Sequence, residues 1–121
     1  MKTFSKILIV DDEPFNVDYL EQELEGLDCE VISASNGQEA LEKVRDSAPD
    51  LVLLDIMMPV MDGYEAARQI HQRYPTLPII GISANAMKSD HEKAIAAGCT
   101  DYLTKPIDEN ILLKKLQEYL G

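Results

Sequence analysis

The chain has 121 residues, of which 45% are hydrophobic and 27% charged, so it is long enough for one domain with an ordinary core and too short for two. Its 22 acidic and 11 basic residues give a formal net charge of -11, which argues against direct binding of nucleic acid because such binding needs a basic surface. It has no run of about 18 apolar residues that could span a membrane, and carboxylates from Asp11 onward interrupt the N-terminal segment too early for a secretory signal. We therefore expect one cytoplasmic domain over residues 1–121, with Cys29 and Cys99 as reduced thiols.

Short apolar runs alternate with segments of helical periodicity in the first half of the chain. The run at residues 7–10 is predicted to be a buried strand, and Pro14 suits the first position of the helix that follows. Residues 29–34 are predicted to form a second strand. Asn36, with a glutamate three residues later, then offers a capping box for a second helix.

The same alternation continues through the second half. Residues 51–54 are four large apolar residues that end at Asp55, as expected of a strand buried on both faces. Asp62 could cap a third helix that Pro75 closes. Strict alternation predicts a parallel sheet with helices on both faces. The remaining predicted elements are strands at residues 79–83 and 101–103 and helices at residues 86–97 and 107–120.

Polar residues follow the predicted strands at their carboxyl ends, where ligands gather in parallel sheets. They are Asp11 and Asp12 after the first strand, Asp55 after the third, Ser83 after the fourth and Lys105 after the fifth. Crowded carboxylates need a shared proton or a cation, and oxygen ligands suit Mg²⁺. A nucleophilic carboxylate beside Mg²⁺, an ammonium and a hydroxyl is a site for a phosphoryl group.

Four motifs carry a resemblance to a known family. ILIVDDE, LVLLDIMMPVMDG, GISA and DYLTKP occur in the order and approximate spacing of the receiver domain of two-component response regulators, which the chain resembles over essentially its whole length. The resemblance implies an α/β, flavodoxin-like, doubly wound fold, with five parallel strands in the order 2-1-3-4-5 and five helices. The residues of these motifs most resemble those of receivers in hybrid histidine kinases and phosphorelays.

The resemblance also implies which residues form the phosphorylation and metal site. Asp55 would be the phosphoacceptor, Asp12 a direct Mg²⁺ ligand and Asp11 a ligand mainly through water, with the backbone carbonyl of Met57 completing the protein ligands. Asn85 and the Met57 side chain would border the path of a water that attacks the phosphorylated state. Because an apolar Met57 gives that water no hydrogen bond, we expect slow dephosphorylation, which Met57→Asn should speed.

Three further residues are assigned roles by the same resemblance. Ser83 and Lys105 would hold the phosphoryl oxygens, and Tyr102 would be the aromatic residue that changes rotamer on activation. The peptide bond that precedes Pro106 would be cis.

The expected function is a signalling switch that accepts a phosphoryl group on Asp55 from a histidine kinase or a histidine phosphotransfer protein, and that catalyses only its own phosphorylation and dephosphorylation. A downstream protein partner would bind the surface of helix 4, strand 5 and helix 5, with no role for nucleic acid or a membrane.

Two other functions are open on the residues alone. One is a Mg²⁺-dependent phosphohydrolase with an aspartate nucleophile, although no second acid or base carboxylate closely follows Asp55. The other is a flavin binder, although the first strand lacks a phosphate loop rich in Ser, Thr and Gly. We expect His71 and His91 to be solvated surface residues.

Overall fold

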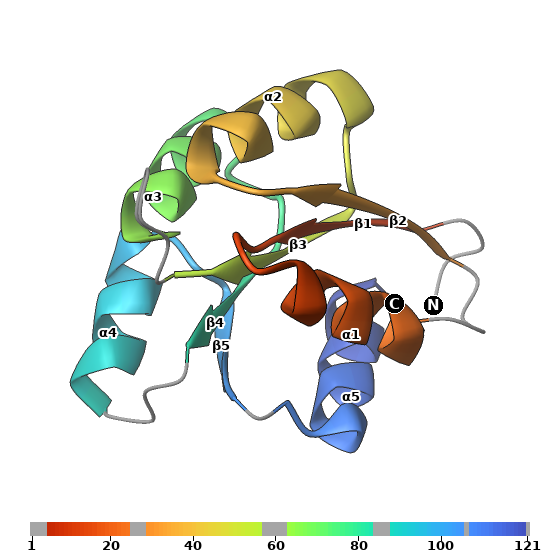
Figure 1. Ribbon diagram of the computed structural model, residues 1–121. Helices are drawn as coiled ribbons and strands as arrows, with labels where there is room; N and C mark the ends of the chain where they lie inside the picture. Colours follow the sequence, from red (N-terminus) through yellow and green to blue (C-terminus); the bar gives the residue numbers. More distant parts are fainter. Residues whose placement is uncertain (1–4, 25–28, 57–62, 84–87, 106, 121) are drawn as a thin grey trace.

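The computed structural model describes residues 5–24, 29–56, 63–83, 88–105 and 107–120. Its parallel sheet has the strand order β2-β1-β3-β4-β5, as predicted (Figure 1). The strands are β1 (Ser5–Val10), β2 (Cys29–Ala34), β3 (Leu51–Asp55), β4 (Ile79–Ser83) and β5 (Asp101–Thr104). The helices are α1 (Pro14–Leu24), α2 (Gly37–Ser47), α3 (Gly63–Arg73), α4 (Lys88–Ala97) and α5 (Glu109–Leu120).

The central strands are buried on both faces, which explains why their sequences are continuously apolar. Side chains of β1 and β3 alternate between two hydrophobic clusters, one beneath α2, α3 and α4 and the other beneath α1 and α5 (Figure 1). Leu8 and Val52 belong to the first cluster and Ile9 and Leu53 to the second, each at most 1% exposed. The free thiols Cys29 and Cys99 agree with the expectation from the sequence.

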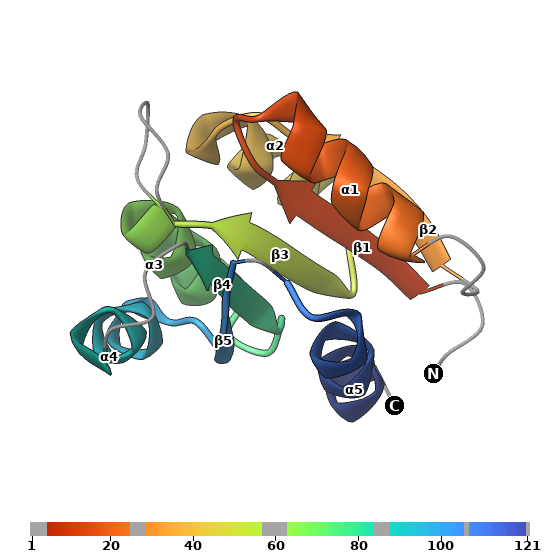
Figure 2. The same cartoon turned by 60° about the horizontal axis from the view of Figure 1, so that its bottom comes forward.

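The register of the sheet brings the strand ends together. Val10 pairs with Leu54, and Asp55 pairs with Ile82, so the carboxyl ends of β1, β3 and β4 lie toward the same end of the sheet (Figure 2). The strand β1 begins two residues earlier than predicted, because Ser5 and Lys6 also pair with β2.

Helix ends follow local side-chain chemistry, with one correction. The Asn36 side chain accepts a hydrogen bond from the backbone N–H of Glu39 at 2.9 Å and so caps α2, as predicted. The prediction that the last helix starts at residue 107 is wrong, because the Asp108 carboxylate caps it and accepts the N–H of Asn110 at 2.8 Å. Gly98, with a φ of 115°, follows the end of α4.

The residue Gly63 sets how closely α3 approaches the end of β3. A Cβ atom there would collide with the Cα of Ile56, and the Gly63 N–H donates to the Ile56 carbonyl at 3.1 Å. Only glycine tolerates this backbone approach.

The predicted cap Asp62 lies outside the described residues. Within them, no helix is long and apolar enough to cross a membrane.

Candidate functional site

Three carboxylates converge at the carboxyl ends of β1 and β3. Asp11, Asp12 and Asp55 each offer an oxygen atom, and these atoms lie within 4.8 Å of one another. Asp11 and Asp55 are buried, at 4% and 5% exposed, whereas Asp12 is exposed. The two strands are buried neighbours, so their first polar residues emerge at the same edge. The cluster therefore combines two desolvated carboxylates with one that remains open to solvent.

The Asp11 carboxylate shows the electrostatic cost of this crowding. Burial, together with the nearby Asp55 carboxylate, raises the pKa of Asp11 to about 6, although the Glu13 N–H and the Lys105 ammonium act in the opposite direction. The Glu13 N–H donates to Oδ1 of Asp11 at 2.9 Å, and the Lys105 Nζ lies 3.8 Å from Oδ2. A cation held by the three carboxylates would add to the positive charge that Lys105 already brings to the site.

Two further predicted residues reach the same edge of the sheet. Ser83 ends β4 and is 2% exposed, and its carbonyl accepts the backbone N–H of Lys105 at 2.8 Å. This bond continues the β4–β5 ladder and places the Lys105 side chain at the mouth of the site, against Asp11. Met57, Asn85 and Pro106, to which the resemblance assigns further roles, lie outside the described residues.

Tyr102 lies near the start of β5, before Lys105, and its ring has a neighbour that the sequence did not indicate. The phenol is 9% exposed and stacks on the imidazole of His91 in α4, with ring centroids 5.1 Å apart and an interplanar angle of 8°. The prediction that His91 is only a solvated surface residue is therefore incomplete. His91 is exposed, but its ring covers Tyr102.

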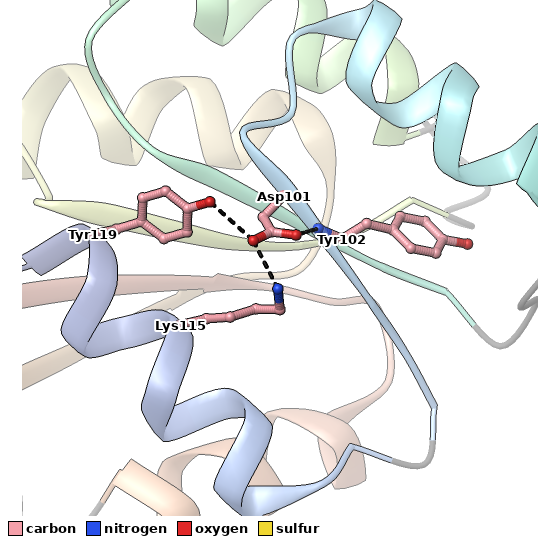
Figure 3. A network of polar contacts seen from close by, with 4 residues as sticks. All are labelled: Asp101, Tyr102, Lys115 and Tyr119. Carbon is pink, nitrogen blue, oxygen red and sulfur yellow. Dashed lines mark hydrogen bonds and ion pairs between the residues drawn. The ribbon is translucent and has the colours of Figure 1, made fainter.

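A polar network ties β5 to α5 beside Tyr102 (Figure 3). Oδ2 of Asp101 accepts hydrogen bonds from the Lys115 ammonium at 2.7 Å and the Tyr119 hydroxyl at 2.9 Å, and Oδ1 accepts the Tyr102 N–H at 2.8 Å. Burial acts to raise the pKa of Asp101, but these donors outweigh it and hold that pKa below its usual value. Burial and the Asp101 carboxylate raise the pKa of Tyr119 to about 12.

An apolar surface borders the acidic cluster on the side of α1. Phe15 is 81% exposed and Tyr19 45% exposed, one helical turn apart, and the Tyr19 hydroxyl donates to the Ile107 carbonyl at 3.3 Å. The helical spacing that turns Leu20 inward turns these rings outward, a signal that was available in the sequence. Beside them is a hollow of about 470 Å³ lined by Asp11, Asn16, Tyr19, Leu20, Ile82, Lys105 and Ile107.

A doubly wound parallel sheet with a lysine beside a carboxylate cluster that could hold a cation defines an α/β protein with an acidic site at the carboxyl edge of its sheet. The family model described as "Response regulator receiver domain" matches residues 7–117, and the chain belongs to this family. It is therefore a receiver domain, a phosphoryl-accepting signalling switch of two-component and phosphorelay systems.

Relatives of several kinds share this domain. The chain is 42% identical over 101 residues to the alkaline phosphatase synthesis transcriptional regulatory protein PhoP of Bacillus subtilis, covering 84% of this chain and 42% of that protein. It is 37% identical over 119 residues to protein PilH of Pseudomonas aeruginosa, covering 97% and 98%. The chain thus spans less than half of the first relative and nearly all of the second.

A solved structure gives the same fold with a metal. The receiver domain of sensor histidine kinase PA1611 from Pseudomonas aeruginosa superimposes with a TM-score of 0.89 and 35% identity over 98% of each chain. That structure is described as having a magnesium ion coordinated in its active site cleft. The carboxylates of the present chain could likewise hold a metal ion.

Proposed function

We propose that Asp55 is the phosphoacceptor and that phosphohistidine is the donor group. An oxygen of the Asp55 carboxylate attacks phosphorus, the new P–O bond forms as the donor's P–N bond breaks, and the imidazole leaves with the electron pair. The observation that carries the proposal is the convergence of Asp11, Asp12 and Asp55, with the Lys105 ammonium 3.8 Å from Asp11. Lys105 can follow the transferred phosphoryl group and neutralise its oxygens.

Mg²⁺ fits this donor set. Three carboxylates with one solvent-exposed member suit an ion that keeps several waters and takes only a few protein oxygens. Asp12 would be a direct ligand and Asp11 a ligand mainly through water, with Asp55 and the Met57 carbonyl also contributing. When bound, the ion would supply positive charge both to the crowded carboxylates and to the phosphoryl oxygens.

Phosphorylation would then bias the whole domain. Ser83 and Lys105 can each form a charge-assisted hydrogen bond to the new phosphoryl oxygens, worth about 1.5 to 3 kcal/mol apiece. Together they supply roughly 3 to 6 kcal/mol, against the about 5.5 kcal/mol that inverts a 1:99 population. Movement of the Ser83 side chain would make space for Tyr102. The resulting change of the Tyr102 rotamer would alter the surface formed by α4, β5 and α5. A downstream protein partner would bind that surface.

Intact mass measurement tests the chemistry. The wild type incubated with acetyl phosphate and Mg²⁺ should gain the mass of one phosphoryl group, and Asp55→Ala should gain none. Asp46→Asn is the control, because Asp46 is a surface carboxylate whose ion pair is with its sequence neighbour Arg45 at 2.8 Å. Labelling that survives Asp55→Ala would overturn the assignment, and rapid multiple turnover of small phosphoesters would indicate a phosphohydrolase instead.

We further propose that the phosphohistidine donor docks on the apolar surface of Phe15 and Tyr19. The adjoining hollow is lined by Asp11 and Lys105, so a protein that docks on this surface would lie directly beside the acidic cluster. An aromatic side chain that is 81% exposed contributes little to the core but can anchor an interface.

Transfer kinetics distinguish this surface from the partner surface on α4. A histidine phosphotransfer domain that labels the wild type should label Phe15→Ala about tenfold or more slowly, since an aromatic anchor is worth roughly 2 kcal/mol. Phosphorylation by acetyl phosphate should not change. Ile95→Ala, which removes an apolar side chain that is 43% exposed on α4, should transfer like the wild type. Equal transfer rates for the two variants would contradict the docking proposal.

A further inference from the structure

Tyr102 is held in its buried position from both sides of β5. The side chains of Asp101 and Tyr102 extend to opposite sides of the strand, Asp101 toward α5 and Tyr102 toward α4 (Figure 3). On the first side, the Lys115 ammonium and the Tyr119 hydroxyl fix Asp101, and Asp101 in turn accepts the N–H of Tyr102. The backbone that carries the Tyr102 ring is thereby anchored, so the ring can change place mainly by rotating about its own side-chain bonds.

On the other side, the imidazole of His91 covers one face of the phenol. One ring edge lies near Gly81 of β4, where a Cβ atom would be 3.7 Å from Cδ2 of Tyr102. The parallel imidazole of His91 lies 5.1 Å away, centroid to centroid, while the His91 residue as a whole stays exposed. Tyr102 also belongs to the hydrophobic cluster beneath α2, α3 and α4, so His91 adds to the cover that this cluster gives the ring. The 9% exposure of Tyr102 is consistent with this cover.

We infer that His91 is a positioning residue for the switch, and that its stacked imidazole stabilises the buried rotamer of Tyr102. The inference rests on the proposed role of Tyr102. In that role the ring is buried when the phosphoryl group is bound. We take the 9% exposed ring seen here as already in that position, so a contact that holds it there also favours the activated state. His91 thus links α4, the surface proposed for a downstream partner, to the phosphorylation site.

The size of the effect follows from the strength of an aromatic pair. Offset or parallel aromatic pairs contribute enough to shift a two-state equilibrium by about 2- to 10-fold. Loss of the stack should therefore weaken binding of a phosphoryl mimic by the same factor, because binding of the mimic and burial of the ring are reciprocally coupled. A substitution of His91 leaves every residue of the acidic cluster unchanged.

The experiment uses beryllofluoride with Mg²⁺ as the phosphoryl mimic and 3-fluorotyrosine as the reporter. The fluorine resonance of Tyr102 is assigned by its loss in Tyr102→Phe. His91→Ala should move this resonance toward the shift of a solvated tyrosine and raise the apparent Kd for beryllofluoride by about 2- to 10-fold. His91→Phe retains a stacking ring and should behave like the wild type, as should Glu92→Ala, an exposed neighbour on the same helix.

Three outcomes would count against the inference or its basis. An unchanged Tyr102 resonance and an unchanged Kd in His91→Ala would overturn the role of the stack. Tighter binding of beryllofluoride by His91→Ala would show that the stack opposes activation, which reverses the inference. A wild-type Tyr102 resonance that does not respond to bound beryllofluoride would instead overturn the switch role proposed for Tyr102, even if His91→Ala still exposes the ring.

Discussion

Replacing Asp11 by asparagine should stabilise the metal-free protein at neutral pH while weakening the site. The carboxylate is 4% exposed and lies beside Asp55, which is why its pKa rises from 3.8 to about 6. A folded-state pKa above the unfolded value contributes stability that is present below about pH 4 and is lost as the pH rises to about 6. A shift of about two units corresponds to about 3 kcal/mol, at roughly 1.4 kcal/mol per unit.

Urea unfolding of wild type and Asp11→Asn in the presence of a chelator measures this quantity. The two proteins should have similar free energies of unfolding at pH 4, where Asp11 is largely protonated, and Asp11→Asn should be more stable by about 3 kcal/mol at pH 7.5. Asp46→Asn removes the same formal charge from an exposed pair and should gain much less, which separates local crowding from the net charge of -11.

Addition of Mg²⁺ provides the second half of this test. A tenfold excess of the ion over its Kd should stabilise the wild type by about 1.4 kcal/mol, and the gain should shrink in Asp11→Asn. An Asp11→Asn protein that is no more stable than the wild type at pH 7.5 would refute the electrostatic reasoning. A gain of the same size at pH 4 would refute it too, since it could not come from ionisation of Asp11.

Four further substitutions test the packing around the site. Asp101→Asn should lower the free energy of unfolding by about 1 to 3 kcal/mol in urea titrations, and the loss should disappear as the pH falls below about 4, because the depressed pKa of Asp101 contributes stability only where the carboxylate is ionised. Tyr119→Phe should remove the part of the wild-type stability that is lost between about pH 10 and 12, measured by thermal unfolding. Asn36→Ala should cost about 1 kcal/mol through loss of the α2 cap. Gly63→Ala should cost more than about 2 kcal/mol and slow phosphorylation by acetyl phosphate, because its Cβ would meet the backbone beside Asp55.

Local sequence patterns were sufficient to predict most of the strands and helices and the parallel sheet. A strand buried on both faces has to be apolar throughout, so residues 51–54 could be recognised directly, and the polar residue that ends such a run has to emerge at the sheet edge. Alternation of strands and helices then required a parallel sheet, which gathers those end residues at one edge. The strand order came from the resemblance of whole motifs, because no local pattern distinguishes one order of parallel strands from another.

The helix boundaries were decided by contacts that periodicity does not contain. Residues 107 and 108 continue the apolar and polar pattern of α5, yet the Asp108 carboxylate accepts the N–H of Asn110 and caps the helix, which therefore starts at Glu109. The sequence indicated Asp62 as a possible helix cap but gave no role to Gly63, the first residue of α3. Its need for close approach to the Ile56 backbone is visible only once α3 is packed against β3.

The amino-acid sequence by itself determined which side chains are buried, which end the strands and which chemistry meets at the edge of the sheet, because burial and strand polarity are properties of short segments. Tertiary structure alone decided which distant side chains touch. His91 stacks on Tyr102, and Lys115 and Tyr119 both contact Asp101. These contacts depend on how α4 and α5 are rotated about their axes and where they lie along β5. Those positions are set by the packing of the whole core, to which nearly every buried residue contributes.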